Sequence, residues 1–164
     1  AAWRRGSVVL EALAGTGIDD VPATRIHRLG HRRGNEAALR ALADSLGIGY
    51  RVIFAGFHPD PSPFYATADL FVLTSNYEGF GNVIVEALSF GLPVVSTNCP
   101  SGPAEILHNG RFGRLVQVGD AAGLAQAMAD ALSVPVDREA LIKRARDFAP
   151  EIAARKYLEL LDLT

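Results

Sequence analysis

Two acidic residues, Glu78 and Glu86, flank a glycine-rich turn, and their type and spacing are the feature of this sequence best suited to chemistry. The apolar run before them, residues 69–75, is rich in strand-forming residues and predicts a buried strand. Gly91-Leu92-Pro93 follows them and predicts the end of a helix, because Gly is favoured just past the last turn and Pro cannot continue it. The predicted order is therefore strand, glycine loop and helix N-terminus.

The start of a helix suits a phosphate group, because its first backbone N–H groups lack partners in the helix and carry about half a positive charge. Phe80, Gly81, Asn82 and Val83 are expected to present these N–H groups, and Gly79 and Gly81 would let the backbone approach a ligand closely. Carboxylates do not bind phosphate, so the two acids are expected to bind neutral hydroxyls on either side of it. A nucleotide-sugar has this arrangement. Asn82 has two interpretations: N-cap of its helix, or a side-chain contact with phosphate.

Short strands and helices alternate along the chain. Strands are expected at residues 52–55, 70–74, 94–96 and 115–118. Helices are expected after Asn35, at residues 64–68, 83–90 and 103–107, after Asp120, after Asp137 and from about Pro150. This alternation predicts an α/β fold with a Rossmann-like parallel sheet and helices on both faces. Ligands of such sheets bind beyond the carboxyl ends of the strands, where the Glu78 loop is expected to lie.

The composition is that of a single globular domain. The 164 residues are 49% hydrophobic and 21% charged, and no apolar run is long enough to cross a bilayer. Cys99 is the only cysteine, which excludes an internal disulfide and favours a reducing, cytoplasmic location. The net charge of −2 gives no reason to expect nucleic acid as a partner. The basic run Arg25–Arg33 has two interpretations: contact with acidic lipid headgroups at the membrane periphery or with a diphosphate, or a solvated or poorly ordered stretch.

Several further segments occur in an order that is known from a protein family. They are Val52–Phe57, Phe64–Asp69, Ser75–Asn82, Pro93–Thr97 and Cys99–Ile106, and the third of them begins the E-x7-E pair of Glu78 and Glu86. In this order they closely resemble the donor-binding domain of retaining GT-B glycosyltransferases of the group 1 type, also called family 4. The resemblance runs from about Asn35 to the end of the chain and implies that residues 1–164 form one nucleotide-sugar-binding domain, one half of a GT-B fold.

The resemblance implies a role for each site residue. Glu78 would contact hydroxyls of the transferred sugar and is the candidate catalytic residue, and Glu86 would bind the ribose hydroxyls of the nucleotide. Phe57 and His58 would border the base, with His58 either stacking there or merely solvated. Ser75, at the end of a strand, would line the pocket.

Residues 1–34 match the family poorly, and the Arg and Lys that usually hold the donor diphosphate have no identified counterpart there. A helix dipole contributes about 0.3–1 kcal/mol, or up to about 2 kcal/mol when partly buried, which is too little for two phosphate charges. Cationic partners are therefore expected from this segment or from another domain. Glu105, at a predicted helix start, is expected either to bind that helix's own N–H groups or to face the cleft.

The implied function is transfer of a sugar from a UDP- or GDP-sugar to an acceptor hydroxyl, in polysaccharide or glycolipid synthesis. The implied partners are the nucleotide-sugar, a lipid-linked or glycan acceptor, and an acceptor-binding domain on the N-terminal side. No resident cofactor or metal is expected, since His27 and His31 lack a third ligand. If the last helix, Ile152 to Leu161, packs across the acceptor-binding domain in the intact protein, it is expected to leave Tyr157 and Leu161 exposed here. The alternative is an isolated nucleotide-binding or interaction module without transferase activity.

Overall fold

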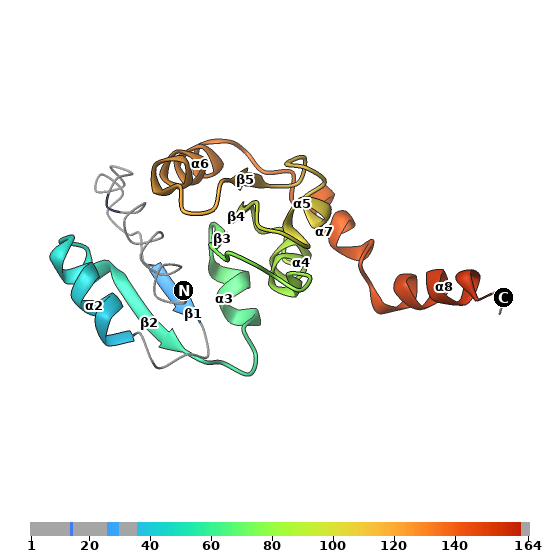
Figure 1. Ribbon diagram of the computed structural model, residues 1–164, viewed down its shortest axis with the longest axis horizontal. Helices are drawn as coiled ribbons and strands as arrows, with labels where there is room; N and C mark the ends of the chain where they lie inside the picture. The colour runs from blue at the N-terminus through green and yellow to red at the C-terminus, as the bar shows by residue number, and fades with distance from the viewer. Residues whose placement is uncertain (1–13, 15–25, 30–35, 162–164) are drawn as a thin grey trace.

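The structure is a computed structural model that describes residue 14, residues 26–29 and residues 36–161. The strands within these residues are β1 (Ile26–Leu29), β2 (Val52–Gly56), β3 (Phe71–Leu73), β4 (Val94–Thr97) and β5 (Arg114–Val116). The helices are α2 (Glu36–Ser45), α3 (Ser62–Thr67), α4 (Asn82–Ser89), α5 (Pro103–Ile106), α6 (Ala121–Ser133), α7 (Arg138–Arg146) and α8 (Pro150–Leu160), and a 3-10 helix, η3 (Gly49–Arg51), precedes β2. From β2 onward the strands and helices alternate as predicted (Figure 1), whereas β1 was not predicted: it lies within the basic run Arg25–Arg33, where no strand was expected.

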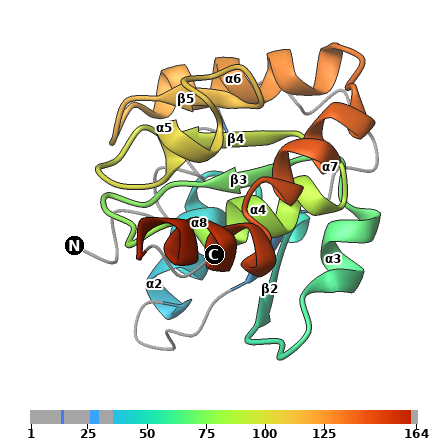
Figure 2. The same ribbon diagram turned by 90° about the vertical axis from the view of Figure 1, so that its right-hand side faces the viewer.

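Every strand pairing in the described residues is parallel. β1 pairs with β2, while β4 lies between β3 and β5, so that hydrogen bonds join the strands in two groups. In Figure 1, α6 lies to the left of the β3–β4–β5 group and α4 and α7 to its right, and Figure 2 shows the same strands from the α4 and α7 side. The prediction of a Rossmann-like parallel sheet with helices on both faces is therefore confirmed. Parallel pairing also brings the loops that follow β3, β4 and β5 to one edge, because their carboxyl ends point the same way.

Two apolar cores lie on opposite faces of the sheet. Val94 and Val95 are adjacent in β4, and each is almost fully buried in a different core, as the two-residue period of a strand requires. The core around Val95 includes residues of α2, β2 and α6, and the core around Val94 includes residues of α3, α4, α5 and α7. The first core therefore joins both groups of strands into one domain.

Local signals set most helix ends as predicted. Asp120 caps α6 by accepting a hydrogen bond from Gly123 N–H at 2.8 Å, and Asp137 caps α7 by accepting from Ala140 N–H at 3.0 Å. Gly91 has a φ of +66° just past the end of α4, which a residue with a side chain rarely adopts. The predicted cap of α2, Asn35, lies outside the described residues.

Other boundaries differ by a few residues. The segment 70–74 was expected to be a buried strand, whereas β3 spans Phe71–Leu73 and its side chains are half-buried. β5 begins and ends earlier than the predicted 115–118, and α3 begins at Ser62 with Pro63 in its first turn. These are the one- or two-residue shifts expected where ends are set by pairing with neighbouring elements.

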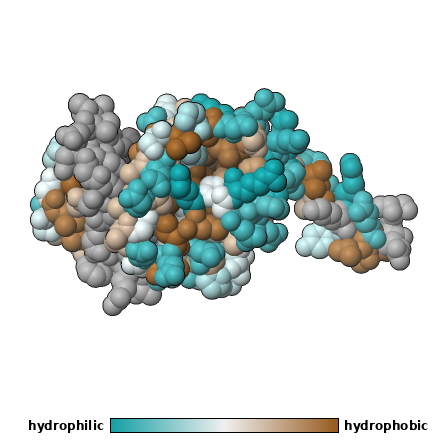
Figure 3. Space-filling view, turned by 90° about the horizontal axis from the view of Figure 1, so that it is seen from above, coloured by the Kyte–Doolittle hydropathy of each residue, from teal (hydrophilic) through white to brown (hydrophobic). Residues whose placement is uncertain are grey.

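The last helix stands apart from the rest of the domain. α8 extends away from the sheet (Figure 1), and its surface includes apolar side chains (Figure 3). Tyr157, Leu158, Leu160 and Leu161 are 69%, 44%, 80% and 64% exposed, which confirms the expectation for Tyr157 and Leu161. No helix within the described ranges is both long enough and apolar enough to span a bilayer.

Candidate functional site

The loop that follows β3 holds Glu78 through contacts made by two hydroxyl side chains. The Ser75 hydroxyl donates a short hydrogen bond to the Glu78 carboxylate. Ser75 is in turn fixed by Thr97, a buried residue at the end of β4, whose hydroxyl lies 2.5 Å from the Ser75 carbonyl oxygen. Ser75 is itself 6% exposed, so it orients Glu78 rather than forming an open wall of a pocket. The sequence analysis expected Ser75 to line the pocket and did not indicate this contact with Glu78.

A row of unpaired N–H groups follows Glu78. In the part of the chain that the structure describes, the backbone N–H groups of residues 79–83 have no hydrogen-bond acceptor. Gly81 has a φ of +96°, and a Cβ added at Gly79 would meet no atom within 4 Å. The backbone at Gly79 is therefore open to close approach, whereas Gly81 is buried and a Cβ there would lie 3.5 Å from Ile84 and 3.6 Å from Ile106. Unpaired N–H groups at a helix N-terminus are the kind of group that binds an anion.

Asn82 does not cap α4. The N-cap is Gly81, in a left-handed conformation, and no side chain accepts a capping hydrogen bond. Asn82 is the first helical residue, and its exposed side chain has no partner among the described residues. The capping interpretation is wrong, because a glycine that adopts a positive φ turns the chain into the helix one residue earlier. A contact of the Asn82 side chain with phosphate stays a prediction.

Glu86 lies one helical turn beyond Asn82. Residues four apart share a face of a helix, so Glu86 is on the face that begins at the unpaired N–H groups, about 6 Å farther along the axis. The opposite face carries Ile84 and Leu88, both fully buried. The Glu86 carboxylate is exposed and accepts a hydrogen bond from the hydroxyl of Tyr65, at 3.0 Å from Oε2. The two acids therefore lie before and after the row of N–H groups along the chain.

The loop that follows β4 packs directly on this row. Gly102 has a φ of +101°, and a Cβ added there would lie 1.6 Å from the Phe80 carbonyl oxygen. The Glu78 N–H lies 3.5 Å from the Pro100 carbonyl oxygen. Because the two loops touch through their backbones, the position of the N–H row depends on a glycine at residue 102.

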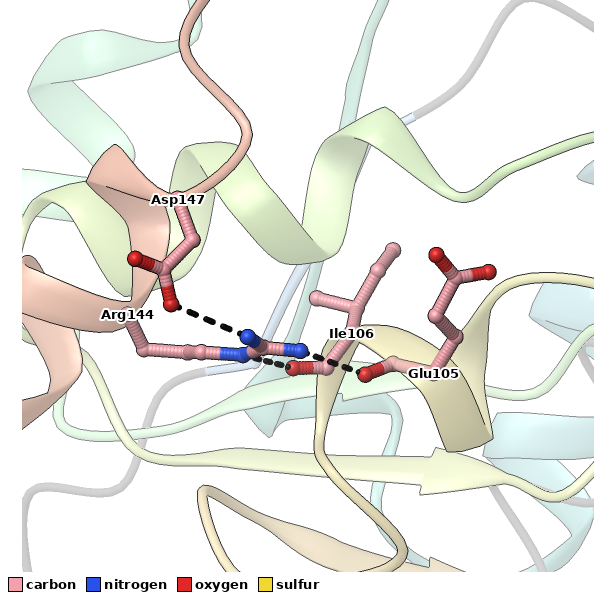
Figure 4. Close-up of polar contacts among 4 residues, drawn as sticks. All are labelled: Glu105, Ile106, Arg144 and Asp147. Carbon is pink, nitrogen blue, oxygen red and sulfur yellow. Dashed lines mark hydrogen bonds and ion pairs between the residues drawn. The ribbon is translucent and has the colours of Figure 1, made fainter. Parts of the chain in front are cut away.

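The Phe80 side chain turns away from this row and packs on Phe148, with ring centroids 5.6 Å apart. Arg144 stacks over the Phe148 ring at 4.5 Å and forms an ion pair with Asp147. Its guanidinium also donates to the carbonyl oxygens of Glu105 and Ile106, at 2.7 and 2.9 Å (Figure 4). The end of α7 thus fixes α5, whose N-cap is Gly102, and supports the loop from behind.

Two predicted site residues need separate mention. The Glu105 carboxylate points away from Arg144 (Figure 4) and accepts no hydrogen bond from its own helix within the described residues, so that interpretation has no support. His58 is exposed, lies 3.0 Å from the Ala55 carbonyl oxygen through Nε2, and stacks at a tilt on Phe64, 4.8 Å away. Phe57, 55% exposed, directly follows β2. A contact of Phe57 or His58 with a base stays a prediction.

Cys99 lies beside the site but is not a reactive group. It is 3% exposed, and burial, followed by the charge of the Glu78 carboxylate, raises the pKa of its thiol. A thiol with a raised pKa is a poor nucleophile at neutral pH. Across the described stretches, no three His, Cys, Asp or Glu side chains gather as a metal-binding group.

The structure adds to the site three residues that the predictions from sequence did not include. Tyr65 holds Glu86 from 21 residues away, Thr97 holds Ser75 from 22 residues away, and Phe148 supports Phe80 from the far end of α7. No local spacing rule connects such distant residues. A hydroxyl at the end of a predicted strand was the one signal that could have indicated Thr97.

Comparison of the sequence with known proteins identifies its family and relatives. The family model described as "Glycosyl transferases group 1" matches residues 5–148. The lipopolysaccharide core biosynthesis glycosyltransferase LpsE of Rhizobium meliloti is 39% identical over 128 residues, which are 75% of this chain and 37% of that protein. A lipopolysaccharide 1,6-galactosyltransferase of Escherichia coli is 35% identical over 103 residues, 60% of this chain and 28% of that protein. The chain thus spans little more than a third of the length of the first relative, and less of the second.

A solved structure gives the same result for the fold. The Anabaena protein Alr3699/HepE, crystallised in complex with UDP, superposes with a TM-score of 0.80 and 26% identity, over 100% of this chain and 46% of that one.

Proposed function

The chain belongs to the group 1 glycosyl transferases, and from this premise we propose that it is the donor-binding domain of a retaining enzyme that transfers a sugar from a nucleotide-sugar to an acceptor hydroxyl. The observation that carries the proposal is the row of unpaired N–H groups at residues 79–83 between two oriented carboxylates. N–H groups at a helix start bind a diphosphate, and carboxylates accept hydrogen bonds from sugar hydroxyls.

We assign the two acids to different parts of the nucleotide-sugar. Glu86 lies on the α4 face about one turn from the N–H row, a span comparable with that from a nucleotide's phosphate to its ribose hydroxyls. We assign it to the ribose. Glu78 lies before the row, and we assign it to the hydroxyls of the transferred sugar. Its orientation by Ser75 fixes which hydroxyl positions it can reach, which is a basis for distinguishing epimeric sugars.

The proposed reaction needs no protein nucleophile. The bond between the anomeric carbon and the diphosphate breaks, the acceptor oxygen bonds to the same face of that carbon, and the departing diphosphate accepts the acceptor's proton. The N–H row stabilises the negative charge that develops on the leaving group. A glycosidase would instead need its two carboxyl groups about 5–5.5 Å apart for retention or about 6.5–9.5 Å apart for inversion, with the scissile bond between them. In the proposed site the diphosphate, and not a scissile glycosidic bond, lies between the two acids, which favours transfer.

The remaining parts of the donor site lie elsewhere. One turn of helix dipole does not balance two phosphate charges, so cationic side chains must come from residues 1–34 or from a second domain that also binds the acceptor. The relatives with lipopolysaccharide in their names support a lipid-linked or glycan acceptor. The crystallised relative with UDP makes a UDP-sugar the first donor to test, with a GDP-sugar second. A cytoplasmic location and peripheral membrane contact stay predictions.

Calorimetric titration of the 164-residue chain with UDP, GDP and ADP tests the proposal. We expect one of them to bind, and Glu86→Ala to weaken that binding at least about tenfold, since one hydrogen bond to a charged group contributes about 1.5–3 kcal/mol. Glu159→Ala is the matched control, because Glu159 is an exposed glutamate on α8, away from the site. Equal affinities of wild type and Glu86→Ala would refute the ribose assignment, and failure of all three nucleotides to bind would favour an interaction module.

A further inference from the structure

Tyr65 makes the one hydrogen bond that the Glu86 carboxylate forms within the described residues. Its hydroxyl lies 3.0 Å from Glu86 Oε2. Tyr65 is 6% exposed, whereas Glu86 is exposed. The contact therefore joins a residue of the core to an acid on the surface of the proposed donor site.

The position of the Tyr65 hydroxyl is set by packing. Its ring lies 5.7 Å from the ring of Phe71 in β3 and 5.7 Å from that of Phe90 at the end of α4. The same core contains Ile84 and Leu88, on the buried face of α4. Because α3, β3 and α4 all hold this ring, the hydroxyl is a fixed point relative to the helix that carries Glu86.

The hydrogen bond from Tyr65 involves one of the two carboxylate oxygens of Glu86. Oε2 accepts from Tyr65, and Oε1 has no partner within the described residues. A carboxylate that is held at one oxygen can present the other to a hydroxyl in one orientation, without losing side-chain freedom when the ligand binds. Burial raises the pKa of Tyr65, and the hydrogen bond to Glu86 and the charge of Glu86 raise it further. The hydroxyl therefore stays a donor at neutral and moderately alkaline pH.

We propose that Tyr65 is a positioning residue that holds Glu86 in the orientation in which it accepts hydrogen bonds from the ribose hydroxyls of the nucleotide. This inference rests on the proposed function, because it needs Glu86 to contact ribose. Tyr65 touches no ligand itself and acts through the carboxylate.

The test compares UDP with 2′,3′-dideoxy-UDP by calorimetry on the 164-residue chain. In wild type, UDP is expected to bind more tightly than the dideoxy compound, and Glu86→Ala is expected to remove this preference. Tyr65→Phe keeps the ring and removes only the hydroxyl. We expect it to reduce the preference about tenfold, the size of one hydrogen bond to a charged group. Tyr50→Phe is the control, because Tyr50 is 84% exposed on η3, before β2.

A double variant separates positioning from a general effect on folding. In the Glu86→Ala background, Tyr65→Phe should cause no further loss of UDP affinity, because the residue through which Tyr65 acts is gone. A further loss there, or a dideoxy preference in Tyr65→Phe equal to that of wild type, overturns the positioning role and leaves the function of Glu86 intact. A wild-type chain that binds UDP and dideoxy-UDP equally overturns the ribose assignment and this inference together.

Discussion

Replacement of Gly102 by alanine is the sharpest perturbation that the structure offers. The added Cβ would lie 1.6 Å from the Phe80 carbonyl oxygen, whereas real Cβ contacts are essentially never under 3.0 Å. The two backbones must therefore separate by at least the difference, 3.0 − 1.6 = 1.4 Å. Since Phe80 belongs to the N–H row, this shift is large against the distance range of an N–H···O hydrogen bond, about 2.7–3.2 Å.

The free energy of unfolding should fall for two reasons that a matched variant separates. Gly102 has a φ of +101° and a ψ of −64°, and a non-glycine residue held in such a sparsely populated region costs about 1–3 kcal/mol. Gly47 also has a positive φ, +72°, but a Cβ there would meet no atom within 4 Å. Gly47→Ala should thus cost only about 1–2 kcal/mol of backbone strain, and Gly102→Ala should cost more because of the overlap.

Urea denaturation and calorimetry with UDP provide the assay. Gly102→Ala should lower the unfolding free energy by about 3 kcal/mol or more, which a domain with about 5–15 kcal/mol of stability survives. Without urea, and at a temperature at which both variants are folded, Gly47→Ala should bind UDP like wild type. Gly102→Ala should bind UDP at least about tenfold more weakly. If Gly102→Ala matched Gly47→Ala in both stability and UDP affinity, the close approach of the two loops and its role in placing the N–H row would be refuted.

Three further perturbations have defined outcomes. Ser75→Ala removes the donor to Glu78, so in the full-length enzyme it should lower kcat about tenfold with little change in UDP affinity; an unchanged kcat would contradict this role. Phe148→Ala removes a half-buried ring from the back of Phe80 and should lower the unfolding free energy by about 1–3 kcal/mol in urea titrations; a change under about 0.5 kcal/mol, the usual size at a neutral surface site, would argue against that support. Because the pKa of Tyr65 is raised in the folded chain, the unfolded chain loses the Tyr65 hydroxyl proton at a lower pH, from about pH 10. Above that pH the unfolding free energy of wild type should fall by up to about 1.4 kcal/mol per pH unit more than that of Tyr65→Phe, as measured by denaturation of both proteins. If the unfolding free energies of the two proteins fell in parallel above about pH 10, the hydroxyl would not be buried.

Much of the fold follows from signals within a few residues. Asp120 and Asp137 are caps in the structure as they are in the sequence pattern, because a cap bonds an N–H group three residues away. The strand, glycine loop and helix around Glu78 were predictable for the same reason. The cap of α4 was not: Asn82 is a good capping residue, but Gly81, in a left-handed conformation, is the N-cap in the structure.

The sequence by itself determined which elements form, their order, and the placement of two acids on either side of a helix N-terminus, because periodicity and capping act over one or two turns. The tertiary structure decided which groups orient those acids. Tyr65 reaches Glu86 only because α3 packs against α4, and Thr97 reaches Ser75 only because β4 pairs with β3. Such contacts depend on how elements pack across 21 or 22 residues of sequence, and no local pattern of residues encodes that distance.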